Sequence, residues 1–438
     1  YEACGHEGGY ADGKCEVCGK PCPHETADES SVDHLHYCNA CGQQMAVRRQ
    51  TKNSQDVTVW FHYTSTDLAA ALAAAKDGDI ITLLDDVDCD SSISLLGDGT
   101  NIKTVTLDLA NHNISSACTF DIGKLYNMTT NTDELYPVKL VIKGSGSITM
   151  PLTVYGGSTL DLSEWAGGTI NELIMYNINV ATAEPALIVG TLGKATGHIN
   201  TLRYGNWWRY SKPAATTLNS GTYGAITVSS FSSETLEIKG LLPEGYVFQR
   251  NDADDAFVEY NAKLSAKGVT TITNLAVVKC AAHVDAKGVN ENGNIADGAD
   301  TLCDYCNTDV TTAQAKVETG DGKTFYCDLK TAVEKANAAG GTITLLQNVT
   351  ELKETLKIDH SKPSAVILDL NGCTISGSGD EASTFLAVST YDTVTIRDSS
   401  EGKTGKIESK GGGDYAVHVS SGKLIIKGGT FVGTDSRP

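Results

Sequence analysis

The sequence is poor in the bulky side chains that fill helical bundles. Of its 438 residues only 8 are Phe and 4 are Met, whereas 44 are Gly, which indicates a turn-rich β protein. No window approaches the roughly 18–20 apolar residues that span a bilayer, so we expect no membrane insertion. A Ser/His/Asp grouping, a glycine-rich phosphate loop and an HExxH motif are also missing, and with them the familiar signatures of hydrolases and nucleotide-binding proteins.

Basic residues are outnumbered, with 34 Lys and Arg against 54 Asp and Glu and a net charge of -20. This charge disfavours nucleic acid and anionic membrane surfaces as partners, because both would be repelled. It is typical of the solvated surface of a secreted protein. The chain begins at Tyr1 without a signal peptide, so we expect a mature or recombinant fragment, secreted or displayed on a cell surface, that lacks its targeting and anchoring parts.

A long internal repeat organises the chain. The stretch from Phe61 to Ile114 recurs from Phe325 to Ile375 with a nearly constant offset, which indicates a duplicated module. The landmarks of the first copy and their counterparts are Asp67-Leu68 and Asp328-Leu329, Thr82-Leu83-Leu84 and Thr344-Leu345-Leu346, and Leu107-Asp108-Leu109-Ala110-Asn111 and Leu368-Asp369-Leu370-Asn371-Gly372.

Each copy opens with a pattern that predicts a short amphipathic helix. Apolar residues fall at i, i+3, i+4 and i+7 in both copies, and Asp67 and Asp328 suit the N-cap. A helix this short needs a surface to cover, so we expect it to close the end of a β core. The apolar residues are Leu68, Ala71, Leu72 and Ala75 in the first copy and Leu329, Ala332, Val333 and Ala336 in the second.

Short β-rich runs punctuated by glycine follow each helix, for example Thr104–Leu109 and Ala365–Leu370. This pattern favours a parallel β-helix over a β-sandwich. The predicted fold class is therefore all-β, with tandem right-handed parallel β-helix domains, short capping helices and small zinc-knuckle units. The second copy stops early, so its last coil is expected to be exposed.

Three units of cysteine and histidine precede the repeats. Each combines one Cys-His pair with one Cys-x-x-Cys pair, whose two-residue gap lets both sulfurs of a turn reach one ion. Three thiolates and one imidazole form a soft tetrahedral set that suits zinc. The units are Cys4, His6, Cys15 and Cys18; Cys22, His24, Cys38 and Cys41; and Cys280, His283, Cys303 and Cys306.

Zinc and a disulfide framework are the two explanations of these units. Disulfides suit an extracellular chain but give the three histidines no purpose, so we favour three zinc ions. Four protein ligands leave no open position, which makes each predicted zinc structural. Four other cysteines are interpreted mostly as small buried apolar residues, with a Cys89–Cys118 bridge left open; they are Cys89, Cys118, Cys327 and Cys373.

These patterns divide the chain into five segments. Residues 1–21 and 22–55 are the first two knuckles, and 56–279 is the first β-helix copy with its capping helix. Residues 280–315 are the third knuckle, which would brace the junction between the copies, and 316–438 is the truncated second copy.

One cluster has the composition of a binding site. Trp, Tyr and Arg dominate binding hot spots, and Trp stacks on sugar faces. Half of all Trp in the chain lie in this cluster, which could otherwise be a loop folded over the core. Its residues are Arg203, Tyr204, Trp207, Trp208, Arg209 and Tyr210. A lyase would also need a basic residue to remove a proton; Arg is scarce in the chain, and Arg397 is expected to pair with a neighbouring carboxylate.

The Cys/His unit, the Asp-Leu-x-x-Ala helix, Thr-Leu-Leu and Leu-Asp-Leu-Asn-Gly together resemble the repeat regions of large surface proteins of gut Firmicutes. Those regions are similar to the pectin-lyase-like β-helix fold, so the resemblance implies β-helix domains of the pectin-lyase type. The resemblance extends in general build to immunoglobulin-binding superantigens of Lachnospiraceae. It implies a non-catalytic binding protein that recognises a host glycoprotein such as immunoglobulin or mucin. The alternative is a carbohydrate-active β-helix enzyme, a polysaccharide lyase or a glycosidase, which would need converging carboxylates.

Overall fold

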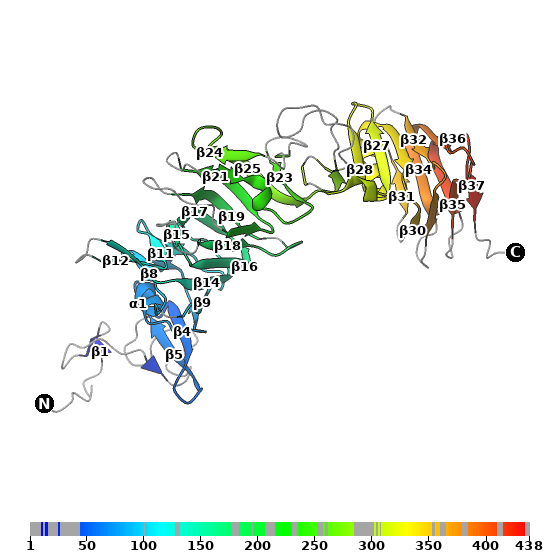
Figure 1. Cartoon of the computed structure of the whole chain (residues 1–438). Coiled ribbons are helices and arrows are strands. Elements are labelled where there is room, and N and C mark those ends of the chain that lie inside the picture. Colours follow the sequence, from blue (N-terminus) through cyan, green and yellow to red (C-terminus); the bar gives the residue numbers. More distant parts are fainter. Residues whose placement is uncertain are drawn as a thin grey trace. The chain divides into compact units, whose positions relative to one another are not determined.

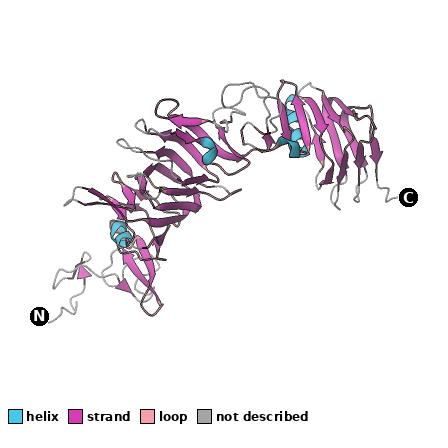
Figure 2. Cartoon of the chain, viewed as in Figure 1, coloured by secondary structure: helices cyan, strands magenta, loops and turns pink. Residues whose placement is uncertain are grey.

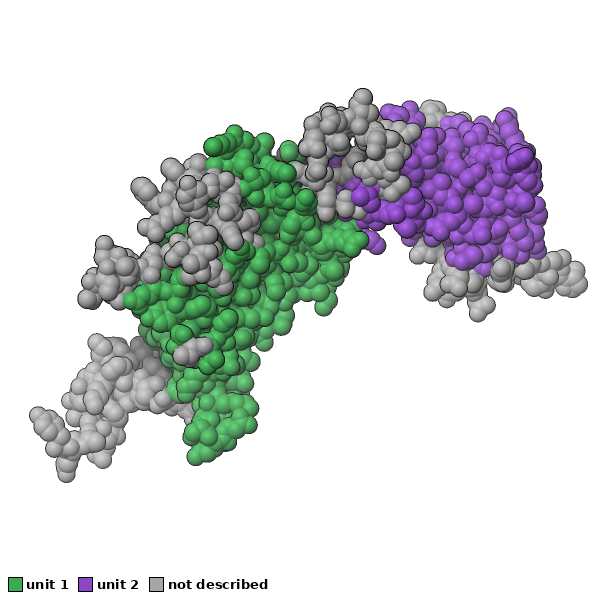
Figure 3. Space-filling view, viewed as in Figure 1, with its two compact units in different colours: residues 1–258, 262–278 green, residues 259–261, 279–438 purple. Residues whose placement is uncertain are grey.

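The computed structural model of the chain describes residues 10–11, 14–15, 25–26, 44–99, 101–127, 132–176, 184–194, 196–205, 215–229, 235–251, 257–258, 262–283, 302–303, 305–306, 308–352, 355–359, 365–377, 384–409 and 415–433. The chain divides into two compact units (Figure 3). Unit 1 comprises residues 1–258 and 262–278, and unit 2 comprises residues 259–261 and 279–438.

Unit 1 is built around two large sheets (Figure 1). The nine-stranded sheet has the order β20 (Ala215–Leu218), β18 (Ala186–Val189), β16 (Thr159–Gly167), β14 (Val138–Ser145), β9 (Lys103–Asp108), β6 (Ile80–Leu83), β4 (Val47–Lys52), β5 (Thr58–Tyr63) and β3 (Glu25–Thr26). The eight-stranded sheet has the order β23 (Tyr246–Arg250), β25 (Thr271–Lys279), β21 (Thr222–Val228), β19 (His198–Tyr204), β17 (Thr169–Tyr176), β15 (Leu152–Tyr155), β11 (Phe120–Ile122) and β8 (Ile93–Leu95).

Successive strands of unit 1 alternate between these two sheets from β14 to β21, and apolar side chains point from both sheets into a common core. In β14, Val138, Leu140 and Ile142 are fully buried while the residues between them are half-buried. This period of two is what places one face of each strand in the core.

Smaller elements complete unit 1. They are the pairs β1 (Tyr10–Ala11) with β2 (Lys14–Cys15), β7 (Val87–Asp88) with β10 (Ile114–Ser115), β12 (Lys124–Asn127) with β13 (Thr132–Leu135), and β22 (Thr235–Glu237) with β24 (Lys263–Ser265), together with the 3-10 helix η2 (Ile238–Gly240).

Unit 2 repeats the arrangement with its own core. The order of its larger sheet is β26 (Ala282–His283), β28 (Thr324–Cys327), β27 (Ala315–Thr319), β29 (Gly341–Leu345), β32 (Val366–Asp369), β34 (Thr384–Arg397) and β31 (Leu356–Ile358), with β36 (Tyr415–Ile426) paired to β34. Its smaller sheet has the order β30 (Val349–Leu352), β33 (Thr374–Gly377), β35 (Lys406–Glu408) and β37 (Thr430–Val432). The 3-10 helix η3 (Val310–Thr312) precedes β27.

The predicted helices are confirmed as α1 (Leu68–Ala73) and α2 (Leu329–Ala339), drawn in cyan in Figure 2. The apolar stripe of each helix is buried as expected. Asp328 caps α2, because its side chain accepts a hydrogen bond from the Thr331 amide. Asp67 stands at the N-cap of α1 without such a bond. No helix in the described part of the chain is long and apolar enough to cross a bilayer.

The two units begin with the same succession of elements, which supports the predicted duplication. In unit 1 the hairpin of β4 and β5 leads to α1 and then to β6, which pairs antiparallel with β4. In unit 2 the hairpin of β27 and β28 leads to α2 and then to β29, which pairs antiparallel with β27. The helices pack against these strands: α1 against β4, and α2 against β27 and β29.

The predicted fold class, tandem right-handed parallel β-helices of the pectin-lyase type, is wrong. The large sheets are mixed, because each unit starts with an antiparallel hairpin and β25 joins β21 antiparallel. The fold is mostly β, with largely parallel sheets arranged in layers rather than as a solenoid. Short glycine-bounded runs predict strands, but they do not distinguish the coils of a solenoid from strands laid in turn into separate mixed sheets.

Candidate metal centre

The third Cys/His unit lies in unit 2 and brings three thiols together. One residue separates Cys280 from the short strand β26, and that strand is held by antiparallel pairing with β28. Cys303 and Cys306 lie on a tight turn closed by the Cys303 amide, which donates to the Thr308 carbonyl at 2.8 Å. These three cysteines are 1–3% exposed.

Two further contacts hold the turn that carries Cys303 and Cys306. Leu302 and Asp309 form an antiparallel bridge across it. The Asp309 side chain accepts the Thr311 amide hydrogen bond at 2.9 Å and so caps η3. An Asx cap of this kind sets the direction in which the chain leaves the turn, so the geometry of the Cys-x-x-Cys pair is determined locally.

The spacing of the sulfurs suits a tetrahedral ion. The Sγ atoms of Cys280, Cys303 and Cys306 all lie within 4.8 Å of one another, and those of Cys280 and Cys303 are 3.9 Å apart. Zn–S bonds of about 2.3 Å in a tetrahedron place sulfurs about 3.8 Å apart, whereas a disulfide joins them at about 2.05 Å. All three cysteines are free thiols, so this buried cluster could bind a metal such as zinc.

The cluster already favours a thiolate. Hydrogen bonds from Cys280 and Cys303 lower the pKa of Cys306 to about 3, assisted by bonds from Thr308. The shared hydrogen bond with Cys303 raises the pKa of Cys280 well above that of a free thiol, and desolvation adds to this rise. The arrangement thus favours the thiolate form of Cys306. Thiolate is the form that a metal requires.

The rest of the predicted ligands are only partly within the described residues. The backbone of His283 lies in β26, opposite Tyr326. Cys15 ends β2. The remaining predicted ligands lie outside the described residues; they are Cys4, His6, Cys18, Cys22, His24, Cys38 and Cys41. In the part of the chain that the structure describes, Cys280, Cys303 and Cys306 form the one cluster of metal-ligand spacing.

The predicted aromatic binding cluster is divided by the structure. Arg203, in β19, forms an ion pair with Glu172 at 2.6 Å. Tyr204 belongs to the core, with 5% of its surface exposed and its hydroxyl bonded to Thr216 at 3.1 Å, so it offers no surface to a partner. Trp207, Trp208, Arg209 and Tyr210 lie outside the described residues.

The four other cysteines are free thiols as well, and Cys89 and Cys118 are not joined. Cys89 and Cys327 are buried as predicted, whereas Cys118 and Cys373 are half-buried. Desolvation raises the pKa of Cys89 to about 11 and that of Cys327 to about 12. Buried thiols with raised pKa values are poor nucleophiles, which fits packing rather than chemistry.

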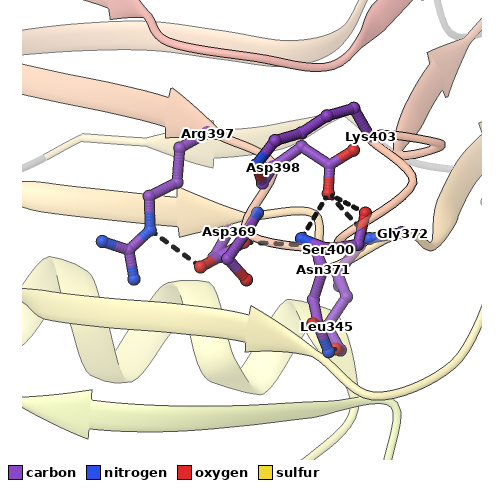
Figure 4. A network of polar contacts seen from close by, with 9 residues as sticks. Leu345, Asp369, Asn371, Gly372, Arg397, Asp398, Ser400 and Lys403 are labelled. Atoms are coloured by element: carbon purple, nitrogen blue, oxygen red, sulfur yellow. Dashed lines mark hydrogen bonds and ion pairs between the residues drawn. The ribbon is translucent and has the colours of Figure 1, made fainter.

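The sequence did not reveal a buried carboxylate network in unit 2 (Figure 4). Asp369 and Asp398 are 1% and 3% exposed. Arg397 Nε lies 2.7 Å from Asp369, which confirms its predicted pairing with a carboxylate. Asp398 accepts from the Gly372 amide at 2.9 Å and the Gly405 amide at 2.6 Å.

Each of these aspartates bonds the amide two residues further along: Asp369 bonds that of Asn371, and Asp398 that of Ser400. Asp108 in unit 1 does the same with Ala110. Such Asx turns satisfy backbone donors where strands end. The recurring Asp at the end of a β run was the available signal for this network.

Comparison of the chain with protein-family models, with curated proteins and with solved structures finds no match. The resemblance to surface proteins of gut bacteria therefore stays a prediction.

Proposed function

We propose that the chain is a non-catalytic binding protein whose Cys/His units are structural zinc sites. The observation that carries the metal assignment is the convergence of three buried thiols from two separate segments within 4.8 Å. His283, three residues after Cys280, is the fourth ligand that the sequence offers. A set of three sulfurs and one nitrogen is closed, so the ion would cross-link the chain and leave no position for a substrate.

A zinc ion at this place would tie the segment before β26 to the Cys303–Cys306 turn. Thiolate ligands select zinc over the harder cations, which prefer oxygen. Because the site forms only when both segments are in place, binding would contribute directly to the folding of this part of unit 2. By analogy of sequence we extend the same role to the two N-terminal units, giving three zinc ions per chain.

The buried carboxylates Asp161, Asp369 and Asp398 do not have the raised pKa of a general acid. A general acid needs a raised pKa. Desolvation opposes ionisation of Asp369 and Asp398, but backbone and side-chain hydrogen bonds outweigh it and lower the pKa of both groups. The pKa of Asp161 is lowered in the same way, because hydrogen bonds from Ser163 and Lys139 outweigh its desolvation. These carboxylates are ionised structural acceptors.

The partner we propose is a host glycoprotein, such as immunoglobulin or mucin, met outside the cell. Its contact surface would be the segment that follows Gly205, where Trp207 and Trp208 provide the aromatic anchors that hot spots require. This part of the proposal rests on the composition of the segment and on the resemblance of the repeat.

Binding to immobilised immunoglobulin and to mucin glycans tests the proposal, beside an assay for polysaccharide degradation. Trp207→Ala and Trp208→Ala should each weaken binding by about 30- to 1000-fold, the usual cost of losing a central anchor, with an unchanged melting temperature. Tyr204→Phe is a poor probe because Tyr204 is buried. Leu192→Ala, which removes an exposed apolar side chain of unit 1 outside the cluster, is the matched control. Degradation of a polysaccharide without binding to either glycoprotein would reverse the assignment.

A further inference from the structure

The turn between β32 and β33 holds an Asn-Gly pair, the sequence most prone to a spontaneous backbone reaction. Asn371 and Gly372 occupy the two central positions of a turn closed by the Cys373 amide, which donates to the Leu370 carbonyl at 2.7 Å. Their φ angles of 44° and 79° are those of a type I′ turn, for which Asn-Gly is the preferred pair. Asn371 is exposed to solvent.

The reaction in question is deamidation. The Gly372 nitrogen loses its proton to a base in the solvent and bonds to Asn371 Cγ, the Cγ–Nδ2 bond breaks and ammonia leaves. The product is a five-membered succinimide, which water opens to aspartate or isoaspartate at position 371. The step requires a free Gly372 nitrogen and a mobile Asn371 side chain.

Both requirements are blocked by hydrogen bonds rather than by burial (Figure 4). The Gly372 amide donates to Asp398 Oδ1 at 2.9 Å. An amide that donates to a carboxylate gives up its proton less readily, because the resulting anion would face a negative charge. The Asn371 side-chain nitrogen in turn donates to the Leu345 carbonyl at 2.9 Å, which restricts the rotation of the carboxamide.

We propose that Asn371-Gly372 is a deamidation site whose reaction is suppressed in the folded chain, and that the Asp398 carboxylate suppresses it. Asp398 is held in place by the Gly405 and Ser400 amides, so the suppressing carboxylate is a buried part of unit 2. Once the reaction occurs it does not reverse, because the ammonia is lost to the solvent. The corresponding turn of unit 1 carries Ala110-Asn111 and has no such pair.

The test follows deamidation at Asn371 by peptide mass spectrometry in the whole chain at mildly alkaline pH. Asn292-Gly293, the second Asn-Gly pair of the sequence, calibrates the rate in urea, where the two pairs should react alike. A charge-assisted hydrogen bond contributes about 1.5–3 kcal/mol, so the native rate at Asn371 should be about ten- to a hundredfold below its rate in urea.

Asp398→Ala should raise the native rate at Asn371 by about tenfold or more, while the remaining bond from Asn371 to the Leu345 carbonyl keeps it below the rate in urea. Asp369→Ala is the matched control, since it removes a buried carboxylate that bonds the Asn371 amide and leaves the Gly372 amide bonded to Asp398. If Asp398→Ala does not fold, Asp398→Asn keeps the shape with a weaker acceptor and should give an intermediate rate. Equal acceleration by the Asp369 and Asp398 variants, or a native rate equal to that in urea, would overturn the proposal.

Discussion

We expect Arg49→Met to destabilise unit 1 by about 3–5 kcal/mol, because it leaves the Asp79 carboxylate buried without its partner. Arg49 Nη1 lies 3.0 Å from Asp79 Oδ2, and the two side chains are 6% and 2% exposed. The same guanidinium donates to the Ala74 carbonyl at 3.0 Å and lies over the Phe61 ring at 4.3 Å. One side chain thus joins β4, the end of α1 and the start of β6.

Urea unfolding followed by tryptophan fluorescence measures this effect in unit 1 alone, because all four Trp of the chain precede residue 278. Lys52→Met is the control in the same strand: Lys52 and Asp56 are 2.6 Å apart but 65% and 80% exposed, so its loss should cost less than about 1 kcal/mol. Adding Asp79→Asn to Arg49→Met should recover part of the stability, since a buried amide costs less than a buried charge. A loss as small as that of the control would refute the role we give to this pair.

Three further predictions concern acid stability, a strained turn and an exposed core end. Because the pKa values of Asp369 and Asp398 are lowered in the folded chain, their ionised forms stabilise unit 2 above about pH 5, and this stabilisation is lost as pH falls through the folded-state pKa values. The free energy of unfolding, measured by circular dichroism between about pH 5 and lower pH, should therefore depend less on pH in Asp369→Asn than in the wild type. Ala110 has a φ of 47°, which alanine adopts at a cost, so Ala110→Asn should stabilise unit 1 by about 0.5–1 kcal/mol in the same urea assay; a loss of stability would contradict the turn assignment. Hydrogen exchange should be faster in residues 424–431 than in residues 158–170, and equal protection would count against an open core end.

The expected fast hydrogen exchange of residues 424–431 follows from the exposure of β36. Val419 pairs with Val388 and Ile426 with Ile396 in the register of β36 and β34. The β34 members are fully buried, whereas Val419 and Ile426 are 40% and 53% exposed. The inward-facing row of β36 is therefore covered on one side only, which leaves its amides with less protection.

The features that the sequence predicted well are those set by local chemistry. Apolar spacing located α1 and α2 because a helix repeats every 3.6 residues whatever it packs against. The two-residue gap of Cys303 and Cys306 specified a turn that directs both sulfurs to one point, and Cys280 joined them as expected. The pairing of Arg397 with a carboxylate followed from its place next to Asp398 in a charged β run, although the partner is Asp369.

The features that were predicted badly from the sequence depend on contacts between residues that lie far apart in the chain. Whether a strand pairs parallel or antiparallel is decided by its neighbours, and nothing within β25 marks it as antiparallel to β21. Tyr204 was assigned to a surface cluster because of the Trp residues after it, but its strand alternation turns it into the core. The aspartate network was missed because its partners, such as Gly372 and Asp398, are brought together only by the stacking of successive strands.

The zinc content of the protein, purified without chelator and measured together with its free thiols, decides between structural zinc and disulfides. We expect about three zinc ions per chain and reduced cysteines, because each unit supplies four ligands. In Cys303→Ser we expect the loss of one zinc ion while the tryptophan fluorescence of unit 1 is unchanged, since Cys303 belongs to unit 2. A chain free of metal, with these cysteines paired in disulfides, would contradict the zinc assignment.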